Sequence, residues 1–113
     1  MKPLSWIGSS ARDVADFPHT AKRETGYQLH LVQSGLEPSD WKPMPTIGAG
    51  ANEIRIREGG QWRVIYVAKC GEAVYVLHAF GKKTQRTAKT DIALASDRYR
   101  MMLAHRAQRP KGE

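Results

Sequence analysis

Two groups of basic residues in the second half of the chain have the types and spacing needed to bind phosphate. Lys82, Lys83 and Arg86 come directly after an apolar run, VLHAF. Arg55 and Arg57 lie two residues apart in EIRIR, so in a strand both side chains leave the same face. Ammonium and guanidinium groups make charge-assisted hydrogen bonds to phosphate oxygens. These residues therefore predict a site for a polyanion such as nucleic acid.

The distribution of charge supports the same prediction. Residues 1–52 carry five Lys or Arg against five Asp or Glu, whereas residues 53–113 carry thirteen against six, so the second half holds the whole net charge of +7. Clustered cations raise the local concentration of phosphates and speed encounter with them. An acidic protein partner and an ordinary solvated basic surface are the alternative explanations.

Several classes of protein are not expected from this composition. The single cysteine, Cys70, allows no disulfide framework or cysteine zinc site, and the four histidines lack the spacing of metal ligands. We therefore expect no metal and no cofactor. No stretch approaches the roughly 18 consecutive apolar residues of a membrane span, and the N-terminus lacks the apolar region of a signal peptide. The sequence predicts a cytoplasmic protein with no membrane partner.

Helices are predicted on both sides of a central group of strands. A short helix over residues 11–17 and a second helix over residues 18–35 lead the chain, with Pro18 between them and Gly35 as the C-terminal cap. A long loop with three prolines follows, over residues 36–50. A last helix covers residues 90–103, and residues 104–113 are expected to form a flexible basic tail.

The middle of the chain alternates with the two-residue period of strands. Three segments, ANEIRIR, QWRVIYVAK and AVYVLHAF, are separated by turns at Gly59-Gly60 and at Gly71. They predict an antiparallel meander whose later strands are buried on both faces, covered by the N-terminal helices. The predicted fold class is α+β: one domain over residues 1–103, with two N-terminal helices, an antiparallel sheet of three to four strands and a C-terminal helix.

This meander is expected to gather the basic residues on one concave surface. Arg63 would lie across the first turn from Arg55, and the third strand would deliver Lys82 near Arg55, away from that turn. Like charges repel, so without an anionic ligand the chain has little reason to collect them.

Aromatic residues and a histidine interleave with these cations. Trp62, Tyr66 and Tyr75 could stack on RNA bases, although core packing is the simpler explanation for each. His78 lies within an apolar strand, where a core histidine is expected more often than a catalytic one.

The order EIRIR, WRVIY, VYVLHAFGKKTQRT and DIALASDRYR resembles the RelE/ParE superfamily of bacterial toxin–antitoxin toxins, and most of all its phage-derived, HigB-like branch. The resemblance runs from about Leu4 to Leu103. It implies a RelE-like fold and a type II toxin that inhibits translation and growth by cleaving mRNA on the ribosome. The ribose 2′-hydroxyl would attack the adjacent phosphate without a metal ion.

The same resemblance assigns roles to individual residues. Arg63 matches the family arginine that contacts the scissile phosphate, and Lys83 matches a basic residue after the last strand. The C-terminal catalytic position, often Tyr or His in the family, falls here at about Lys89. Arginine is a poor base, whereas lysines among other cations exchange protons more readily, so Lys83 and Lys89 are predicted to transfer protons. The residues predicted to bind RNA phosphates are Arg55, Arg57, Lys82, Gln85 and Arg86.

The resemblance also implies a partner and leaves alternatives open. A cognate antitoxin, often a helix-turn-helix protein encoded next door, would inhibit the toxin, and mRNA on the ribosome would be the target. The ParE-like branch shares the fold but acts on DNA gyrase without hydrolysis. A basic binding module without chemistry is the third possibility.

Overall fold

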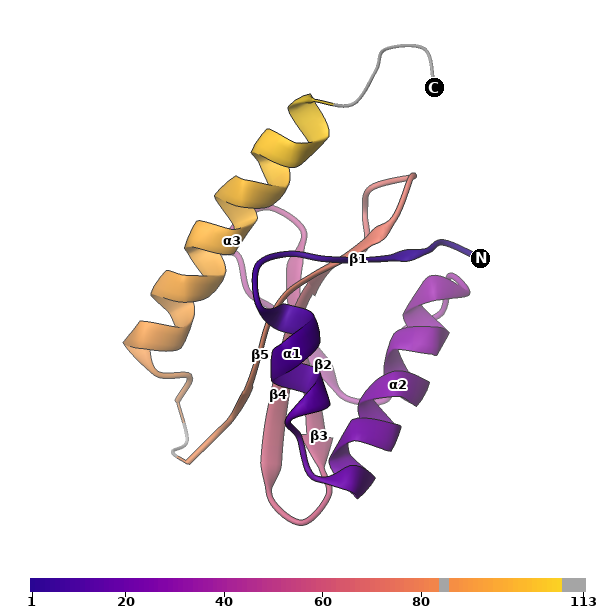
Figure 1. The fold of residues 1–113 in the computed structure, drawn as a ribbon, viewed down its shortest axis with the longest axis vertical. Coiled ribbons are helices and arrows are strands. Elements are labelled where there is room, and N and C mark those ends of the chain that lie inside the picture. The colour runs from indigo at the N-terminus through magenta and orange to yellow at the C-terminus, as the bar shows by residue number, and fades with distance from the viewer. Residues whose placement is uncertain (84–85, 109–113) are drawn as a thin grey trace.

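The structure is a computed structural model that describes residues 1–83 and 86–108. One five-stranded sheet runs in the order β1-β5-β4-β3-β2 through the middle of the molecule (Figure 1). The strands are β1 Leu4–Trp6, β2 Trp41–Pro43, β3 Ala51–Arg57, β4 Gln61–Val67 and β5 Val74–Gly81. The helices are α1 Ser10–Ala15, α2 His19–Gln33 and α3 Lys89–Ala107.

The predicted meander is confirmed as β3, β4 and β5, which pair antiparallel in sequence order. Its first turn uses Gly59 and Gly60, both with positive φ, a conformation that glycine adopts without a steric penalty. Arg55 lies directly opposite Arg63, as the predicted register requires. The α+β class is therefore confirmed, and the meander forms the centre of the sheet.

Two short edge strands enlarge the sheet beyond the predicted three to four strands. β1 pairs parallel to β5, and β2 pairs antiparallel to β3 within the proline-rich loop. The sheet is thus mixed, whereas an entirely antiparallel one was expected. β1 and β2 have three residues each, too few to show the alternation of a strand in the sequence. Pro43 is tolerated in β2 because an edge strand leaves one of its sides unpaired.

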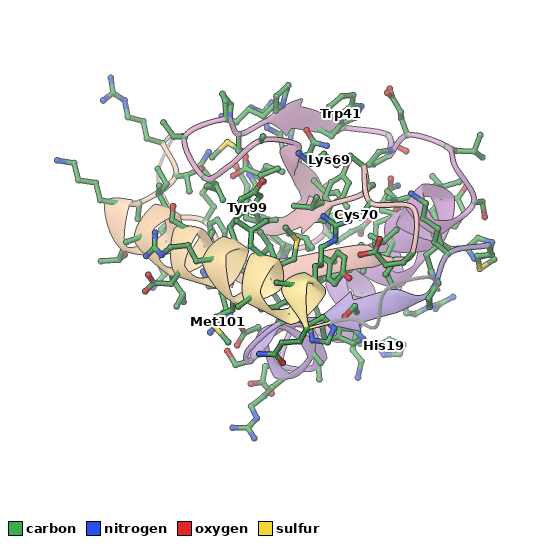
Figure 2. The ribbon with its side chains drawn as sticks, turned by 90° about the horizontal axis from the view of Figure 1, so that it is seen from above. His19, Trp41, Lys69, Cys70, Tyr99 and Met101 are labelled. Atoms are coloured by element: carbon green, nitrogen blue, oxygen red, sulfur yellow. The ribbon has the colours of Figure 1, made fainter. Side chains whose placement is uncertain are left out.

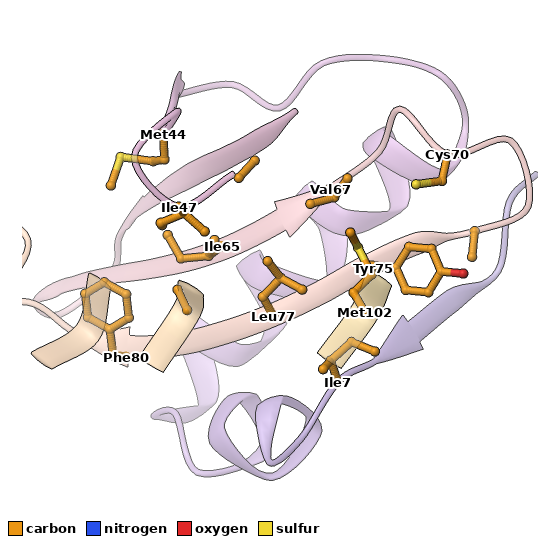
Figure 3. Close-up of a cluster of buried hydrophobic side chains, with 13 residues drawn as sticks. Ile7, Met44, Ile47, Ile65, Val67, Cys70, Tyr75, Leu77, Phe80 and Met102 are labelled. Atoms are coloured by element: carbon orange, nitrogen blue, oxygen red, sulfur yellow. The ribbon is translucent and has the colours of Figure 1, made fainter. Parts of the chain in front are cut away.

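Helices cover both faces of the sheet. Val14 of α1, Leu29 of α2 and Phe17 between the two helices are buried against one face, which confirms the predicted cover by the N-terminal helices. α3 lies on the other face, where Ala95 and Met102 join the apolar cluster drawn in Figure 3. α3 and α2 accordingly stand on opposite sides of the sheet in Figure 1.

A β-bulge in β5 changes which side chains face α3. Ile65 pairs with His78 and the next residue, Tyr66, pairs with Val76, so Leu77 is the extra residue. Bulges re-aim side chains in this way. Both Leu77 and His78 consequently lie on the face that α3 covers, where the His78 ring stacks on Phe80 with ring centroids 4.8 Å apart.

α3 is longer than predicted. It continues to Ala107, so residues 104–107 of the predicted tail are helical, because Arg106 is anchored to Glu72 by a 2.6 Å ion pair. Residues 109–113 lie outside the described part of the chain. Tyr99 and Met101 point to opposite sides of α3 in Figure 2, and only Tyr99 packs against the sheet. No helix within the described residues is long and apolar enough to cross a membrane.

Candidate phosphate-binding site

Neighbouring strands bring the predicted basic residues together under the start of α3. Arg55 on β3 lies opposite Arg63 on β4, and Phe80 on β5 lies opposite Arg63 on its other side. Arg57 pairs with Gln61 beside the first turn. The predicted convergence of Arg55, Arg57 and Arg63 is therefore confirmed in geometry, and all three side chains leave the face that α3 covers.

Arg63 is not on the surface of this cluster but beneath it, with 3% of the residue exposed. Its Nη1 donates to the Trp62 carbonyl at 2.9 Å and its Nη2 to Gln61 Oε1 at 3.0 Å. Burial lowers the pKa of Arg63; the Glu53 carboxylate opposes this shift and Arg55 adds to it. To contact a phosphate, Arg63 would exchange the exposed Gln61 amide for the ligand.

A buried carboxylate, Glu53, lies among these cations and was not predicted as part of the site. It is fully buried, with Oε1 3.7 Å from Arg63 Nε and 3.9 Å from Arg55 Nε. Thr87 Oγ1 donates to Oε2 at 2.9 Å, which ties the segment before α3 to β3. Within the described residues Glu53 Oε1 and both Nε atoms lack a hydrogen bond. The alternation of EIRIR, which puts Glu53 on the face of Arg55, was the available signal.

A second carboxylate, Asp40, partners the arginines from the loop before β2. Its oxygens lie 3.9 Å from Arg55 Nη1 and 3.6 Å from Arg57 Nη2. Asp40 and Glu53 together supply internal counter-charge. The gathered cations therefore do not by themselves require an external anion, because two acids of the chain already offset part of their repulsion.

Lys82 lies at the opposite end of β4 from the one predicted, beside the Gly59-Gly60 turn. Its backbone N–H donates to the Gln61 carbonyl at 2.8 Å, so β5 ends beside the first turn, and the expectation that it ends away from that turn is wrong. In an antiparallel pair the end of one strand must lie at the start of its partner. Burial lowers the pKa of Lys82, and repulsion by Arg63 and Lys42 adds to the shift, while Glu53 opposes it.

A small cavity of about 180 Å³ lies between the end of β5 and the first turn of α3, next to this cluster. Its lining residues are Phe80, Gly81, Lys82, Lys83, Arg86, Ala88 and Asp91. Lys82, Lys83 and Arg86 are thus brought together as predicted. Lys89 is the exposed first residue of α3 and does not line this cavity. Gln85 lies outside the described residues.

The family of the chain follows from its sequence as a whole. Residues 12–100 match the phage-derived Gp49-like proteins (DUF891). The chain belongs to this Gp49-like family. No curated protein matches the sequence. The family includes toxin-like proteins of toxin–antitoxin systems, so membership is compatible with a toxin role and confirms the phage-derived part of the predicted resemblance.

The three aromatic residues of this Gp49-like protein that could have stacked on bases pack in its core instead. Tyr66 and Tyr75 are buried, and burial raises the pKa of Tyr66 to about 12. Trp62 packs on Phe17, with ring centroids 4.9 Å apart, on the face opposite the cations. None of these three rings is presented beside the cationic cluster, so core packing rather than base stacking explains Trp62, Tyr66 and Tyr75.

Cys70 and His78 complete the set of reactive side chains. Cys70 is buried and burial raises the pKa of its thiol, so the thiolate that a nucleophile needs is disfavoured. His78 is buried as predicted but is not surrounded by apolar groups alone, since Asp91 and Asp13 lie at its two ring nitrogens. Residues 1–83 and 86–108 hold no group of three potential metal ligands.

Proposed function

We propose that this Gp49-like protein is the toxin of a type II toxin–antitoxin system and a ribosome-dependent mRNA endoribonuclease. The observation that carries the proposal is the grouping of Arg55, Arg63 and Lys82 where β3, β4 and β5 meet, next to a cavity lined by two further cations. Membership of a family with toxin-like proteins supports the biological role.

The proposed reaction needs positive charge rather than a metal ion. As the 2′-hydroxyl oxygen attacks phosphorus, negative charge develops on the phosphate oxygens, and fixed cations stabilise it. Arg55 and Arg57 would bind these oxygens from β3, with Arg63 beneath them. Lys82, whose pKa is lowered, is suited to protonate the leaving 5′-oxygen. Lys83 and Lys89 are the further candidates for proton transfer.

The test is a cell-free translation reaction in which mRNA 5′ ends are mapped with and without ribosomes. Codon-linked cuts that require ribosomes are expected. The double variant Arg55→Gln/Lys83→Gln should lose at least about tenfold in cleavage rate, whereas Arg12→Gln/Arg100→Gln, at exposed positions elsewhere, should not. Each double variant removes two of the same charges, so a simple net-charge effect would slow both equally.

Expression of the protein in cells, with mRNA 5′ ends and DNA damage both measured, separates the competing functions. DNA damage with inhibited gyrase and no mRNA cuts would establish the ParE-like alternative, and neither effect would leave a basic binding module. If Lys83→Ala and Lys89→Ala both cleave at the parental rate, those two lysines do not transfer the proton.

The proposal includes an inhibitory partner, a cognate antitoxin. A reading frame next to the gene that encodes a helix-turn-helix protein is expected, and co-expression of that protein should abolish cleavage and growth arrest. Growth arrest that persists with an excess of the neighbouring protein would contradict this pairing.

A further inference from the structure

A carboxylate–imidazole pair has no role in the site described above, and its carboxylate, Asp91, lines the cationic cavity. Asp91, in the first turn of α3, lies with Oδ1 2.8 Å from His78 Nε2. The Asp91 side chain is 25% exposed and lines the cavity beside Lys82 and Lys83, whereas the His78 side chain is 7% exposed and lies behind it. Among the described residues that line this cavity, Asp91 is the only acidic one.

The imidazole is held from several directions. The β-bulge at Leu77 turns His78 toward α3, and the ring stacks on Phe80. On its other side His78 Nδ1 lies 3.8 Å from Asp13 Oδ2 of α1, without a hydrogen bond among the described residues. Arg98 lies 4.0 Å from the same Asp13 oxygen.

The fixed ring in turn orients the Asp91 carboxylate. An ionised carboxylate only accepts hydrogen bonds, so Nε2 carries the proton and donates it to Asp91 Oδ1. This bond engages Oδ1, and among the described residues Oδ2 has no hydrogen bond or ion pair. The reaction needs a proton acceptor near the phosphate. Arginine stays protonated and cannot be that acceptor, whereas a carboxylate can.

We propose that Asp91 is the catalytic base of the cleavage reaction and that His78 is its positioning residue; this inference rests on the proposed function. Asp91 Oδ2 takes the proton of the 2′-hydroxyl as the O2′–P bond forms. The P–O5′ bond breaks, and Lys82 gives its proton to the 5′-oxygen. The products are a 2′,3′-cyclic phosphate and a 5′-hydroxyl; Asp91 then gives its proton to water and Lys82 takes one from water, which restores the carboxylate and the ammonium.

The test compares two model mRNAs in single-turnover cleavage on saturating ribosomes, one natural and one with sulfur in place of the bridging 5′-oxygen. A thiolate leaves without a proton, so the sulfur substrate needs the base but not the acid. Asp91→Asn should slow both substrates by about 10²-fold or more. Lys82→Met should slow the natural substrate far more than the sulfur one, because the loss of its positive charge affects both substrates and the loss of its proton affects only the natural one. Asp97→Asn, an exposed acid on the same helix, should cleave both at the parental rate.

A second pair of variants tests His78. Thermal denaturation first shows that both variants fold. His78→Leu should slow cleavage, and His78→Gln, which retains an N–H donor for Asp91, should cleave faster than His78→Leu. A purely structural role would lower the unfolding temperature of His78→Leu and leave the saturated rate unchanged.

The outcomes separate this inference from the proposed function. If the parent protein cleaves and Asp91→Asn cleaves equally fast, Asp91 is not the base, although the endoribonuclease proposal stands. If Asp91→Asn slows only the natural substrate, Asp91 acts as the acid and the assignment is overturned. If the parent protein cuts no mRNA on ribosomes, both proposals fall.

Discussion

The apolar cluster beneath α3 has a Glu–Arg pair at each end, and the two pairs are built differently. Figure 3 shows Phe80 at one end of the cluster and Tyr75 with Cys70 at the other. At the Tyr75 end, Glu72 accepts hydrogen bonds from the Tyr75 hydroxyl and from Arg106 Nε, both at 2.6 Å. These bonds, that from Arg106 above all, lower the pKa of Glu72 to about 2.

At the Phe80 end some buried polar atoms have no hydrogen bond among the described residues. Glu53 Oε1 approaches Arg55 and Arg63 only to 3.9 Å and 3.7 Å, and these buried atoms have no hydrogen bond among the described residues. Satisfied buried groups stabilise a fold, whereas unsatisfied ones cost free energy and need another explanation, such as a ligand. The bonds of Glu72 fasten α3 to the sheet, and the unpaired atoms around Glu53 support the proposal that this end of the cluster binds an anionic ligand.

The largest expected effect is on the free energy of unfolding when Glu53 or Glu72 is replaced by alanine. Glu53→Ala would leave Arg63 buried without its counter-charge, so the free energy of unfolding should fall by about 3–5 kcal/mol. Glu72→Ala should cost less, about 1–3 kcal/mol, because the Arg106 side chain that it leaves behind is 37% exposed and can be solvated. Urea denaturation measures both. A Glu53→Ala variant no less stable than Glu72→Ala would contradict the comparison.

The lowered pKa of Lys82 predicts a specific pH dependence at the Glu53 end. The ammonium form is the proton donor, so the cleavage rate should fall as pH rises through a pKa below the ordinary 10.5. Lys82→Arg stays protonated there and should move this decline to higher pH, with a difference of about tenfold in relative rate under alkaline conditions. Lys69→Arg, an exposed position, is the matched control. An unchanged alkaline limb in Lys82→Arg would exclude Lys82 as the acid.

Low pH should reduce the contribution of Glu72, at the Tyr75 end of the cluster, to the free energy of unfolding. The pKa of Glu72 is lowered from 4.5 to about 2, so its ionised form contributes stability above pH 4.5 that is lost as pH falls toward about 2. The slope for this one proton is at most about 1.4 kcal/mol per pH unit. Urea midpoints at about pH 5, 4 and 3 should fall less steeply for Glu72→Gln than for the parent. Glu37→Gln, on an exposed loop, should retain the parental slope.

A substitution remote from both ends gives the smallest effect and calibrates the others. Gly26 lies within α2, where an added Cβ would meet nothing within 4 Å. Gly26→Ala should raise the free energy of unfolding by about 0.5–1 kcal/mol, because alanine loses less conformational entropy in a helix. Its cleavage rate should equal that of the parent. A change in rate would mean that global stability, rather than local chemistry, controls the assay.

Local pattern was sufficient for most of the fold. Two-residue alternation predicted β3, β4 and β5, and the glycine turn fixed the register that places Arg55 opposite Arg63. Helical spacing and caps predicted α1, α2 and α3 because these signals lie within a few residues of one another. β1 and β2 escaped prediction because each has three residues and exists only through its partner strand.

In the candidate site, too, some features follow from residue spacing and others only from tertiary contacts. The sequence by itself determined that cations gather on one face of the meander, because residue spacing along a strand dictates which side chains share a face. Only the tertiary structure decided that Arg63 is buried, that Glu53 and Asp40 offset its neighbours, and that Asp91 meets His78. Those contacts join residues far apart in the chain, and the bulge at Leu77 that aims His78 depends on how β5 pairs with β4.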